Sequence, residues 1–179
     1  MIVYAANNLQ RREQAYDLLA LAARDRWGWE RLPPLTRISG GKPCFPDQPD
    51  RQFNLSHSGP FALCVLDDAP VGVDIQIVKE WRPGLPRRTC SKRELAWLER
   101  QGGGWETFAL LWSMKEARVK QDGKGLTRPV REISSPLPEG DETLLFQEGL
   151  WFRSWTGDGW AATVCGLTPP PEHIVWKTL

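Results

Sequence analysis

The chain has 179 residues, a formal net charge of +1 and a hydrophobic fraction of 41%. This length allows one domain or two small ones, and the hydrophobic fraction excludes an intrinsically disordered chain. The net charge is close to zero, so we expect no broad attraction to nucleic acid or to an anionic membrane. Any basic group that binds phosphate must therefore act locally.

The cysteine and histidine content argues against a zinc site. No two of the four cysteines form a C-x-x-C pair, and the chain has only two histidines. The first residues do not resemble a signal peptide, and no stretch reaches the roughly 18 apolar residues of a membrane span. We therefore expect a reduced, cytoplasmic protein, and we expect it to be a monomer.

The first half of the chain predicts one helix and a small antiparallel sheet. Residues 1–6 are an apolar run typical of a strand, and a helical pattern follows over residues 15–22. Further strands are predicted at 53–58 and 61–66, and a tight turn at 67–70 leads into the next strand. We interpret these last three strands as an antiparallel meander.

The strand after that turn, residues 71–77, alternates apolar and polar side chains. Its apolar residues share one face, so Asp74 and Gln76 project from the other face, about 6–7 Å apart along the backbone. An acid in such a strand costs desolvation energy unless a cation or a hydrogen-bond donor accompanies it. The alternative is a half-exposed strand whose polar residues face water.

Two helices are predicted in the second half of the chain. Ser91-x-x-Glu94 is a capping box, so one helix is expected to begin at Ser91 and to end at the glycines 102–104. A second helix stops at Gly123, and Lys115 is a gap in its apolar stripe. Strands are then expected at 144–146, 150–154 and 160–165, with a last apolar segment at 174–176.

Glu116 and Lys120 lie one turn apart on this second helix, close to its glycine-rich end. In that arrangement Glu116 can hold a divalent cation and Lys120 can hold a phosphate. The alternative is an ordinary surface ion pair, which contributes only about 0.3–0.5 kcal/mol to stability.

Four blocks of sequence occur in order and together resemble the 4'-phosphopantetheinyl transferases. They are Gly41-Lys42-Pro43, Phe53-Asn54-Leu55-Ser56-His57-Ser58-Gly59, Gly72-Val73-Asp74-Ile75 and Trp112-Ser113-Met114-Lys115-Glu116-Ala117-Arg118-Val119-Lys120. Their order and spacing match the surfactin-synthetase-activating type, a two-lobed single chain, and the similarity runs from about Glu13 to Cys165. The alternative is that the matches are due to chance in an unrelated α+β interaction domain.

The resemblance implies an α+β fold of two similar small lobes, related by a pseudo-two-fold axis, with the active site in the cleft between them. The N-terminal lobe, residues 1–69, would face the adenosine and the 3'-phosphate of coenzyme A. The C-terminal lobe, residues 70–179, would carry the metal site and the docking surface for a carrier protein. This boundary rests on the resemblance, since no change in composition marks it.

The activity implied by the resemblance is Mg2+-dependent transfer of the 4'-phosphopantetheine arm of coenzyme A to a serine of an apo acyl or peptidyl carrier protein. Adenosine 3',5'-bisphosphate is released. The alternative within the family is a catalytically impaired homologue that still binds coenzyme A. The sequence leaves open which carrier protein is served.

Three residues fall at the metal-site positions of the family. Asp74 and Glu116 match ligands of Mg2+, and Glu116 would also accept the serine proton, directly or through a water. Gln76 occupies a position where this type usually carries Glu. We therefore expect its amide oxygen or a water to fill that position, and weaker metal binding.

The resemblance also assigns the groups that bind coenzyme A. Lys120 matches the lysine that contacts the pyrophosphate. Gly41-Lys42-Pro43 matches the segment that lies along the adenine, where the backbone rather than the side chains does the recognition.

The pocket for the 3'-phosphate is less regular. Ser56 and His57 match groups that hold this phosphate, with a structural histidine as the alternative for His57. Arg12 is expected to add a basic group. Asp17 stands where many members have a hydroxyl, and an acid there would repel the phosphate.

Docking of the carrier protein in the family involves the segment that corresponds to residues 81–98. Four basic residues of this segment would meet the acidic helix of a carrier protein: Arg87, Arg88, Lys92 and Arg93. A solvated helix start is the alternative.

Overall fold

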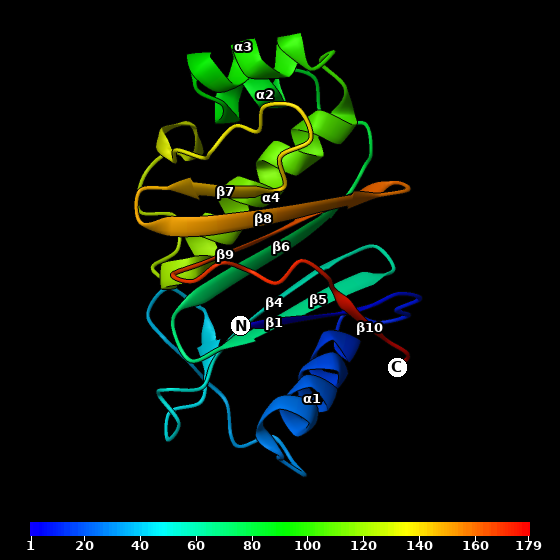
Figure 1. The fold of residues 1–179 in the computed structure, drawn as a ribbon, viewed down its shortest axis with the longest axis vertical. Coiled ribbons are helices and arrows are strands. Elements are labelled where there is room, and N and C mark those ends of the chain that lie inside the picture. The colour runs from blue at the N-terminus through cyan, green and yellow to red at the C-terminus, as the bar shows by residue number, and fades with distance from the viewer.

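The computed structural model describes residues 1–179 as two four-stranded sheets with helices packed against them (Figure 1). The first sheet has the order β10-β1-β5-β4 and consists of β1 (Ile2–Ala6), β4 (Gln52–Ser58), β5 (Phe61–Asp67) and β10 (Val175–Lys177). The second sheet has the order β6-β9-β8-β7 and consists of β6 (Val71–Ile77), β7 (Leu144–Gln147), β8 (Leu150–Gly157) and β9 (Trp160–Gly166). A short ribbon joins β2 (Thr36–Arg37) to β3 (Pro43–Cys44).

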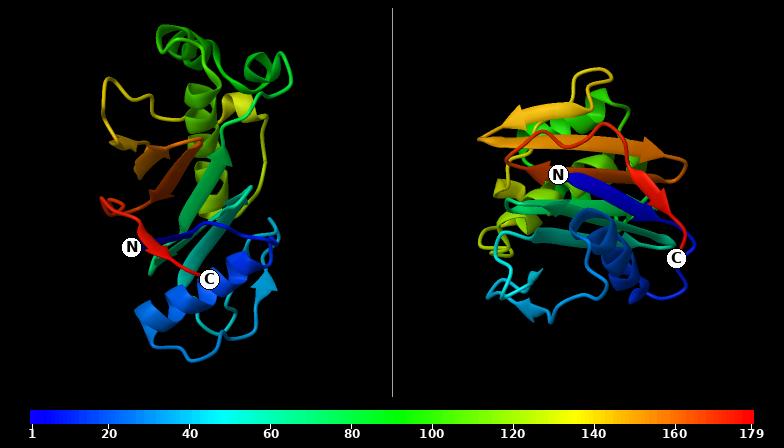
Figure 2. Two further views of the ribbon diagram at one scale, coloured as in Figure 1. Left: turned by 90° about the vertical axis from the view of Figure 1, so that its right-hand side faces the viewer. Right: turned by 60° about the horizontal axis from the view of Figure 1, so that its bottom comes forward.

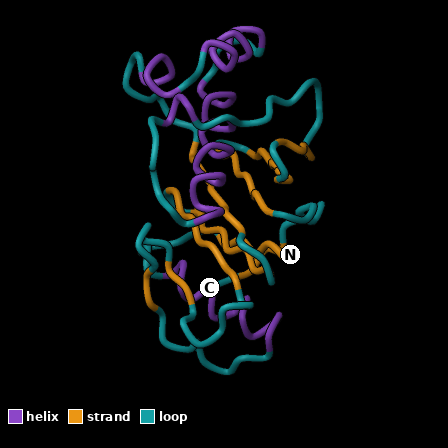
Figure 3. Tube along the Cα trace, turned by 90° about the vertical axis from the view of Figure 1, so that its left-hand side faces the viewer, coloured by secondary structure: helices purple, strands orange, loops and turns teal.

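The helices are α1 (Gln14–Trp27), α2 (Leu85–Thr89), α3 (Lys92–Arg100) and α4 (Trp105–Asp122), with a short 3-10 helix, η1 (Val130–Glu132). Figure 3 shows the strands in the middle of the molecule, with α1 at one end and α2 and α3 at the other. This architecture confirms the predicted α+β class. None of the helices combines the length and the apolar character that crossing a membrane requires.

The helix predicted over residues 15–22 is confirmed as α1, and it covers the first sheet. Leu18 and Leu19 are fully buried and pack in one core with Phe45 and Phe53. Removing these side chains from water is the main force that holds the helix on the sheet. The helix ends at Gly28, whose φ of 71° is a left-handed conformation that glycine adopts without strain.

Helix α4 lies across β6 and β9 of the second sheet. A Cβ added at Gly72 in β6 would lie 2.0 Å from the carbonyl oxygen of Ala117, so only glycine permits this close approach. Since α4 also carries Glu116 and Lys120, the contact at Gly72 sets how near these side chains come to β6.

The capping box at the start of α3 is confirmed. Ser91 Oγ accepts from the Glu94 N–H at 3.3 Å, and Glu94 Oε2 accepts from the Ser91 N–H at 2.6 Å. The interpretation of Lys115 as a gap in the apolar stripe of α4 needs correction, because its side chain is 1% exposed and belongs to the interior. Its ammonium lies 2.8 Å from Glu94 and donates to the carbonyls of Val130 and Ile133, which together compensate the buried charge.

The predicted meander is wrong at its third strand. Strands β4 and β5 form an antiparallel hairpin as expected, but β6 pairs with β9 in the second sheet. On its other edge β6 lies beside β4 without a backbone ladder, and side chains of β4 take the place of main-chain acceptors. The N–H groups of Val73, Ile75 and Ile77 donate to Asn54 Oδ1, Ser56 Oγ and Ser58 Oγ at 2.9, 3.2 and 3.0 Å.

The chain passes from the first sheet to the second between β5 and β6, and it returns to the first sheet at its end. Strand β10 pairs in parallel with β1, so the two ends of the chain lie in one sheet (Figures 1 and 2). The last strand, β10, therefore belongs to the first sheet and not to the second. The division into lobes 1–69 and 70–179 stays a prediction.

Candidate active site

Asp74 on β6 is the most enclosed of the predicted site residues, with 2% of its surface exposed. The alternative of a carboxylate facing water is therefore wrong for this residue. Its Oδ1 accepts from Ser56 Oγ at 2.9 Å and from Lys120 Nζ at 2.6 Å. Its Oδ2 accepts from the side-chain amide of Gln76 at 2.6 Å. Three donors from β4, β6 and α4 thus meet on one buried carboxylate.

Lys120 forms its ion pair with Asp74, and not with Glu116 as the simple helix-surface alternative requires. Its ammonium also donates to Ser56 Oγ at 3.1 Å. The side chain is 28% exposed, so the ammonium remains partly accessible from solvent. Lys120 therefore links α4 to the buried carboxylate of Asp74, and part of the Lys120 side chain stays accessible to solvent.

Glu116 lies within electrostatic reach of both charges. Burial raises the pKa of its carboxyl, the neighbouring charge of Asp74 raises it further, and Lys120 lowers it. Two carboxylates thus lie near one ammonium, so the local charge is negative when both are ionised. A group with a raised pKa is better suited to accept a proton near neutral pH than an ordinary glutamate.

The donor set of this site is limited but fits Mg2+. The structure contains no group of three or more His, Cys, Asp or Glu side chains that could hold a metal ion. Mg2+ nevertheless needs only one or two carboxylates, because it keeps several waters and takes oxygens from a phosphate ligand. Asp74 and Glu116 supply two carboxylates with excess negative charge. Gln76 uses its amide N–H on Asp74, so its oxygen is the atom left to coordinate.

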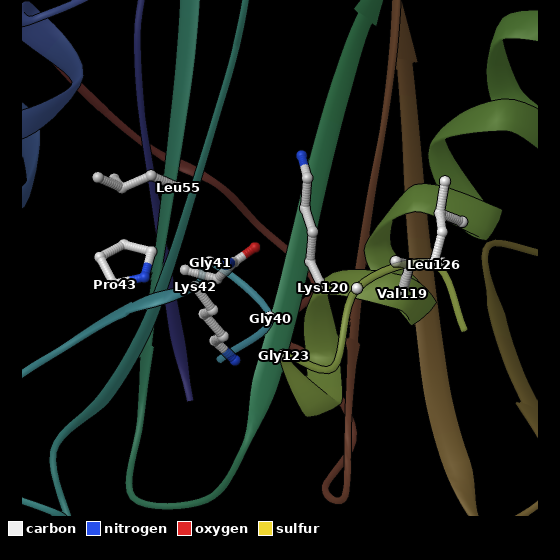
Figure 4. Close-up of a pocket in the computed structure, with 11 residues that line it drawn as sticks. Gly40, Gly41, Lys42, Pro43, Leu55, Val119, Lys120, Gly123 and Leu126 are labelled. Atoms are coloured by element: carbon white, nitrogen blue, oxygen red, sulfur yellow. The ribbon is translucent and has the colours of Figure 1, made fainter. Parts of the chain in front are cut away.

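A cavity of about 290 Å³ opens beside Lys120 and is lined from two parts of the chain (Figure 4). Gly41, Lys42 and Pro43 form one wall together with Leu55 of β4. Residues 119–126, at the end of α4 and the turn after it, contribute to the other side. Figure 4 shows the side chain of Lys120 between these walls, running along β6. The structure thus brings the predicted adenine segment and the predicted pyrophosphate lysine to one cavity.

A smaller cavity of about 160 Å³ adjoins the first, since both are lined by Pro43 and Leu55. Its other lining residues include Ser56, His57 and Arg12, which the sequence grouped at the 3'-phosphate. Asp17 is exposed on α1 and is not part of the lining.

Arg37 also lines this smaller cavity, and sequence reasoning missed it. Its guanidinium donates to the carbonyl of Gly41 at 2.6 Å. The signal that points to it is the ribbon β2–β3, in which Arg37 is the partner of Pro43 across the glycine turn. A basic residue shortly before that turn is thereby placed next to Arg12 and His57.

The side chain of Lys42 runs from the main cavity to the backbone of two other segments. Its stem lines the main cavity, but its ammonium donates to the carbonyls of Val71 at 2.7 Å and Gln121 at 2.9 Å. Burial lowers the pKa of this lysine to about 8. The side chain is therefore tied to the protein's own backbone.

The basic residues predicted to meet a carrier protein lie on α2 and at the start of α3. Arg87, Arg88, Lys92 and Arg93 are all exposed. Beneath them, Cys90, Trp97 and Phe108 form a separate small core that fixes these helices on α4.

Comparison with known proteins gives a consistent family relationship. A model of the 4'-phosphopantetheinyl transferase superfamily matches residues 70–165, just over half of the chain. The chain is 36% identical over 142 residues to the 4'-phosphopantetheinyl transferase Sfp of Bacillus subtilis (strain 168), and 43% identical over 142 residues to the 4'-phosphopantetheinyl transferase ffp of Bacillus subtilis. Each match covers 75% of this chain and 63% of the relative.

A shorter match points to the same superfamily. The chain is 36% identical over 113 residues to the 4'-phosphopantetheinyl transferase AcpT of Salmonella typhi, covering 60% of this chain and 58% of that protein. In all three comparisons the chain spans less than two thirds of the length of the relative.

Proposed function

The chain belongs to the 4'-phosphopantetheinyl transferase superfamily, and we propose that it transfers the phosphopantetheine arm of coenzyme A to a serine of an apo acyl or peptidyl carrier protein. The observation that carries the proposal is the convergence of Asp74, Glu116 and Lys120 beside a cavity lined by Gly41–Pro43. The sequence similarity concerns the order of these residues, whereas their meeting at one place is a property of the fold.

Coenzyme A is proposed to occupy the two adjoining cavities. Its adenine lies along the backbone of Gly41–Pro43 in the larger cavity. Its 3'-phosphate enters the smaller one, where Arg12, Arg37 and His57 surround it with donors. The exposed position of Asp17, outside the lining of this cavity, reduces the repulsion that the sequence predicted.

The pyrophosphate is proposed to lie at Lys120, whose ammonium is partly exposed. In the reaction the serine oxygen forms a bond to the phosphorus that carries the pantetheine, and the bond from that phosphorus to the bridging oxygen breaks. Negative charge moves to adenosine 3',5'-bisphosphate. Lys120 stabilises that charge as it develops.

Asp74 and Glu116 would hold Mg2+, with the amide oxygen of Gln76 or a water beside them. The ion, when bound, supplies positive charge that neutralises the pyrophosphate. Glu116 accepts the serine proton, directly or through a water, and its raised pKa favours this role.

The carrier protein is proposed to dock on α2 and α3, where four exposed basic side chains face solvent. Carrier helices with acidic surfaces would be steered there by charge. We further propose that residues 1–69 and 70–179 act as two lobes related by an approximate two-fold axis, with the active site between them. We also propose a cytoplasmic monomer; the four free cysteines favour a reducing compartment.

A homologue that binds coenzyme A without transferring it is the second candidate. Gln76 favours this candidate, because it removes one negative charge from the metal site and hydrogen-bonds to Asp74. The retention of both carboxylates and of Lys120 at the cavity favours the enzyme.

One experiment separates the two candidates. The protein is incubated with coenzyme A, Mg2+ and a panel of apo-carrier proteins, and the carriers are weighed by mass spectrometry. We expect at least one carrier to gain a phosphopantetheine group. Binding of coenzyme A with every carrier left unmodified would establish the impaired homologue instead.

A further inference from the structure

The glycine turn at residues 40–41 touches the end of helix α4 so closely that no side chain fits between them. A Cβ added at Gly40 would lie 1.7 Å from the carbonyl oxygen of Gly123. A Cβ at Gly123 would lie 2.5 Å from Cδ1 of Ile38 and 3.0 Å from the stem of Lys42. Two segments some 80 residues apart in the sequence therefore interlock through backbone contact.

The ammonium of Lys42 fastens this contact. It donates to the carbonyl of Gln121 in the last turn of α4 and to the carbonyl of Val71 at the start of β6. The last four carbonyls of a helix have no partner within the helix, and the helix dipole makes them favourable sites for a cation. Lys42 thus serves as a cap that is supplied from a different part of the chain.

The surroundings of this ammonium are mostly uncharged. Asp122 is the one carboxylate that acts on it, together with the thiols of Cys44 and Cys165. With the ammonium buried and bonded to two carbonyls, its hydrogen bonds are worth more than those of an exposed lysine.

Both segments joined by Lys42 line the cavity proposed for coenzyme A. We propose that Lys42 is a positioning residue whose ammonium holds the glycine turn at a fixed distance from the end of α4 and so keeps this cavity shaped for the adenosine half of coenzyme A. The inference rests on the proposed function, and it assigns the Lys42 side chain to the protein and not to the ligand.

The proposal predicts a particular kinetic pattern. Lys42→Met keeps the apolar stem and removes the three donors, so the glycine turn loses its attachment. We expect the KM for coenzyme A to rise about tenfold, the effect of losing a hydrogen bond to a charged group. At saturating coenzyme A, kcat and the KM for the carrier protein should stay within about twofold of the parent, because the reacting groups are untouched.

Binding without turnover gives an independent readout. Adenosine 3',5'-bisphosphate is titrated by calorimetry into the parent, into Lys42→Met and into Lys177→Met. Lys177 pairs with Asp25 and lines neither of the two cavities, so its variant controls for the loss of one ammonium. We expect about tenfold weaker binding for Lys42→Met and no more than about twofold for the control.

A second variant tests the same contact without touching Lys42. Gly40→Ala places a methyl group against Gly123 and pushes the turn away from the helix. This variant should weaken binding of the bisphosphate by a similar factor. It remains informative if Lys42→Met does not fold. If Gly40→Ala or folded Lys42→Met binds the bisphosphate as tightly as the parent does, the role of Lys42 is overturned and the proposed function stands. A parent that binds neither the bisphosphate nor coenzyme A overturns the proposed function together with it.

Discussion

Asp74 receives hydrogen bonds from three side chains, and the chemistry of the site depends on which of them leave when ligands bind. Lys120 and Gln76 each contact one of its oxygens at 2.6 Å. The ammonium of Lys120 therefore lies where a cation is attracted. Metal and pyrophosphate binding should draw Lys120 from the carboxylate towards the phosphates.

Replacing Lys120 tests its assignment to the pyrophosphate. Lys120→Ala should lower the rate of carrier modification by about a hundredfold or more, the range for losing one preorganised transition-state donor. The rate is measured at saturating Mg2+ and coenzyme A. Lys177→Ala removes a lysine from a surface Asp pair and should leave the rate unchanged. A Lys120→Ala protein within a few-fold of the parent would take Lys120 out of the site.

Gln76→Glu restores a third carboxylate next to Asp74. When a chelator removes Mg2+, the new carboxylate repels Asp74, and the hydrogen bond from the Gln76 amide is lost. The Tm of the variant should therefore fall, by roughly 2–4 °C for each kcal/mol of repulsion. Mg2+ should raise Tm more in the variant than in the parent, and half-maximal activity should need less Mg2+. Equal Mg2+ responses in both proteins would mean that position 76 does not face the metal.

Lys42 makes a contribution to stability that changes with pH. Its pKa is lowered from 10.5 in the unfolded chain to about 8, so between these values the unfolded state binds more protons. Stability from this group therefore rises as the pH increases from about 8 towards 10.5. The free energy of unfolding is measured in urea for the parent and for Lys42→Met at pH 7 and pH 10. We expect that of the parent to increase relative to that of the variant at the higher pH. A difference that stays constant across this range would contradict the lowered pKa.

At the scale of the elements, helix ends can be predicted from the sequence because they depend on neighbouring residues. The pairing of strands depends on contacts between distant residues and is missed. The start of α3 follows from a capping box, and the end of α4 follows from Gly123 in the left-handed conformation. The pairing of β6 could not be read from its alternation, because a strand with one apolar face suits either neighbour. Its place is decided by the close approach of α4 at Gly72 and by the acceptors of β4.

The buried pair between Lys115 and Glu94 links α4 to the start of α3, and it is an interaction that sequence reasoning did not foresee. Lys115→Met should lower the free energy of unfolding by about 3–5 kcal/mol, because Glu94 is left as an uncompensated buried charge. Glu94→Gln added to this variant should recover part of the loss. Urea unfolding of the two single variants and the double variant measures the coupling. A loss below about 1 kcal/mol for Lys115→Met would mean that the pair is not buried in solution.

At the scale of the whole molecule, the candidate site depends on the junction of the two sheets. Asn54, Ser56 and Ser58 of β4 accept from the backbone of β6. These hydrogen bonds bring Asp74 next to Ser56 of the first sheet. Family resemblance selects the motif residues one by one. It gives neither Arg37 in the smaller cavity nor the attachment of Lys42 to α4, because both arise from how the motifs are packed.

The central claim is the transfer of phosphopantetheine, and the intact mass of a purified apo-carrier protein tests it most directly. The carrier is incubated with coenzyme A and Mg2+ together with the parent protein or with Glu116→Gln. We predict that the parent adds one phosphopantetheine group to the carrier, that chelator or Glu116→Gln prevents the addition, and that a carrier lacking its acceptor serine stays unmodified. Unchanged carrier mass with the folded parent, across a panel of carriers and with coenzyme A bound, would contradict the account.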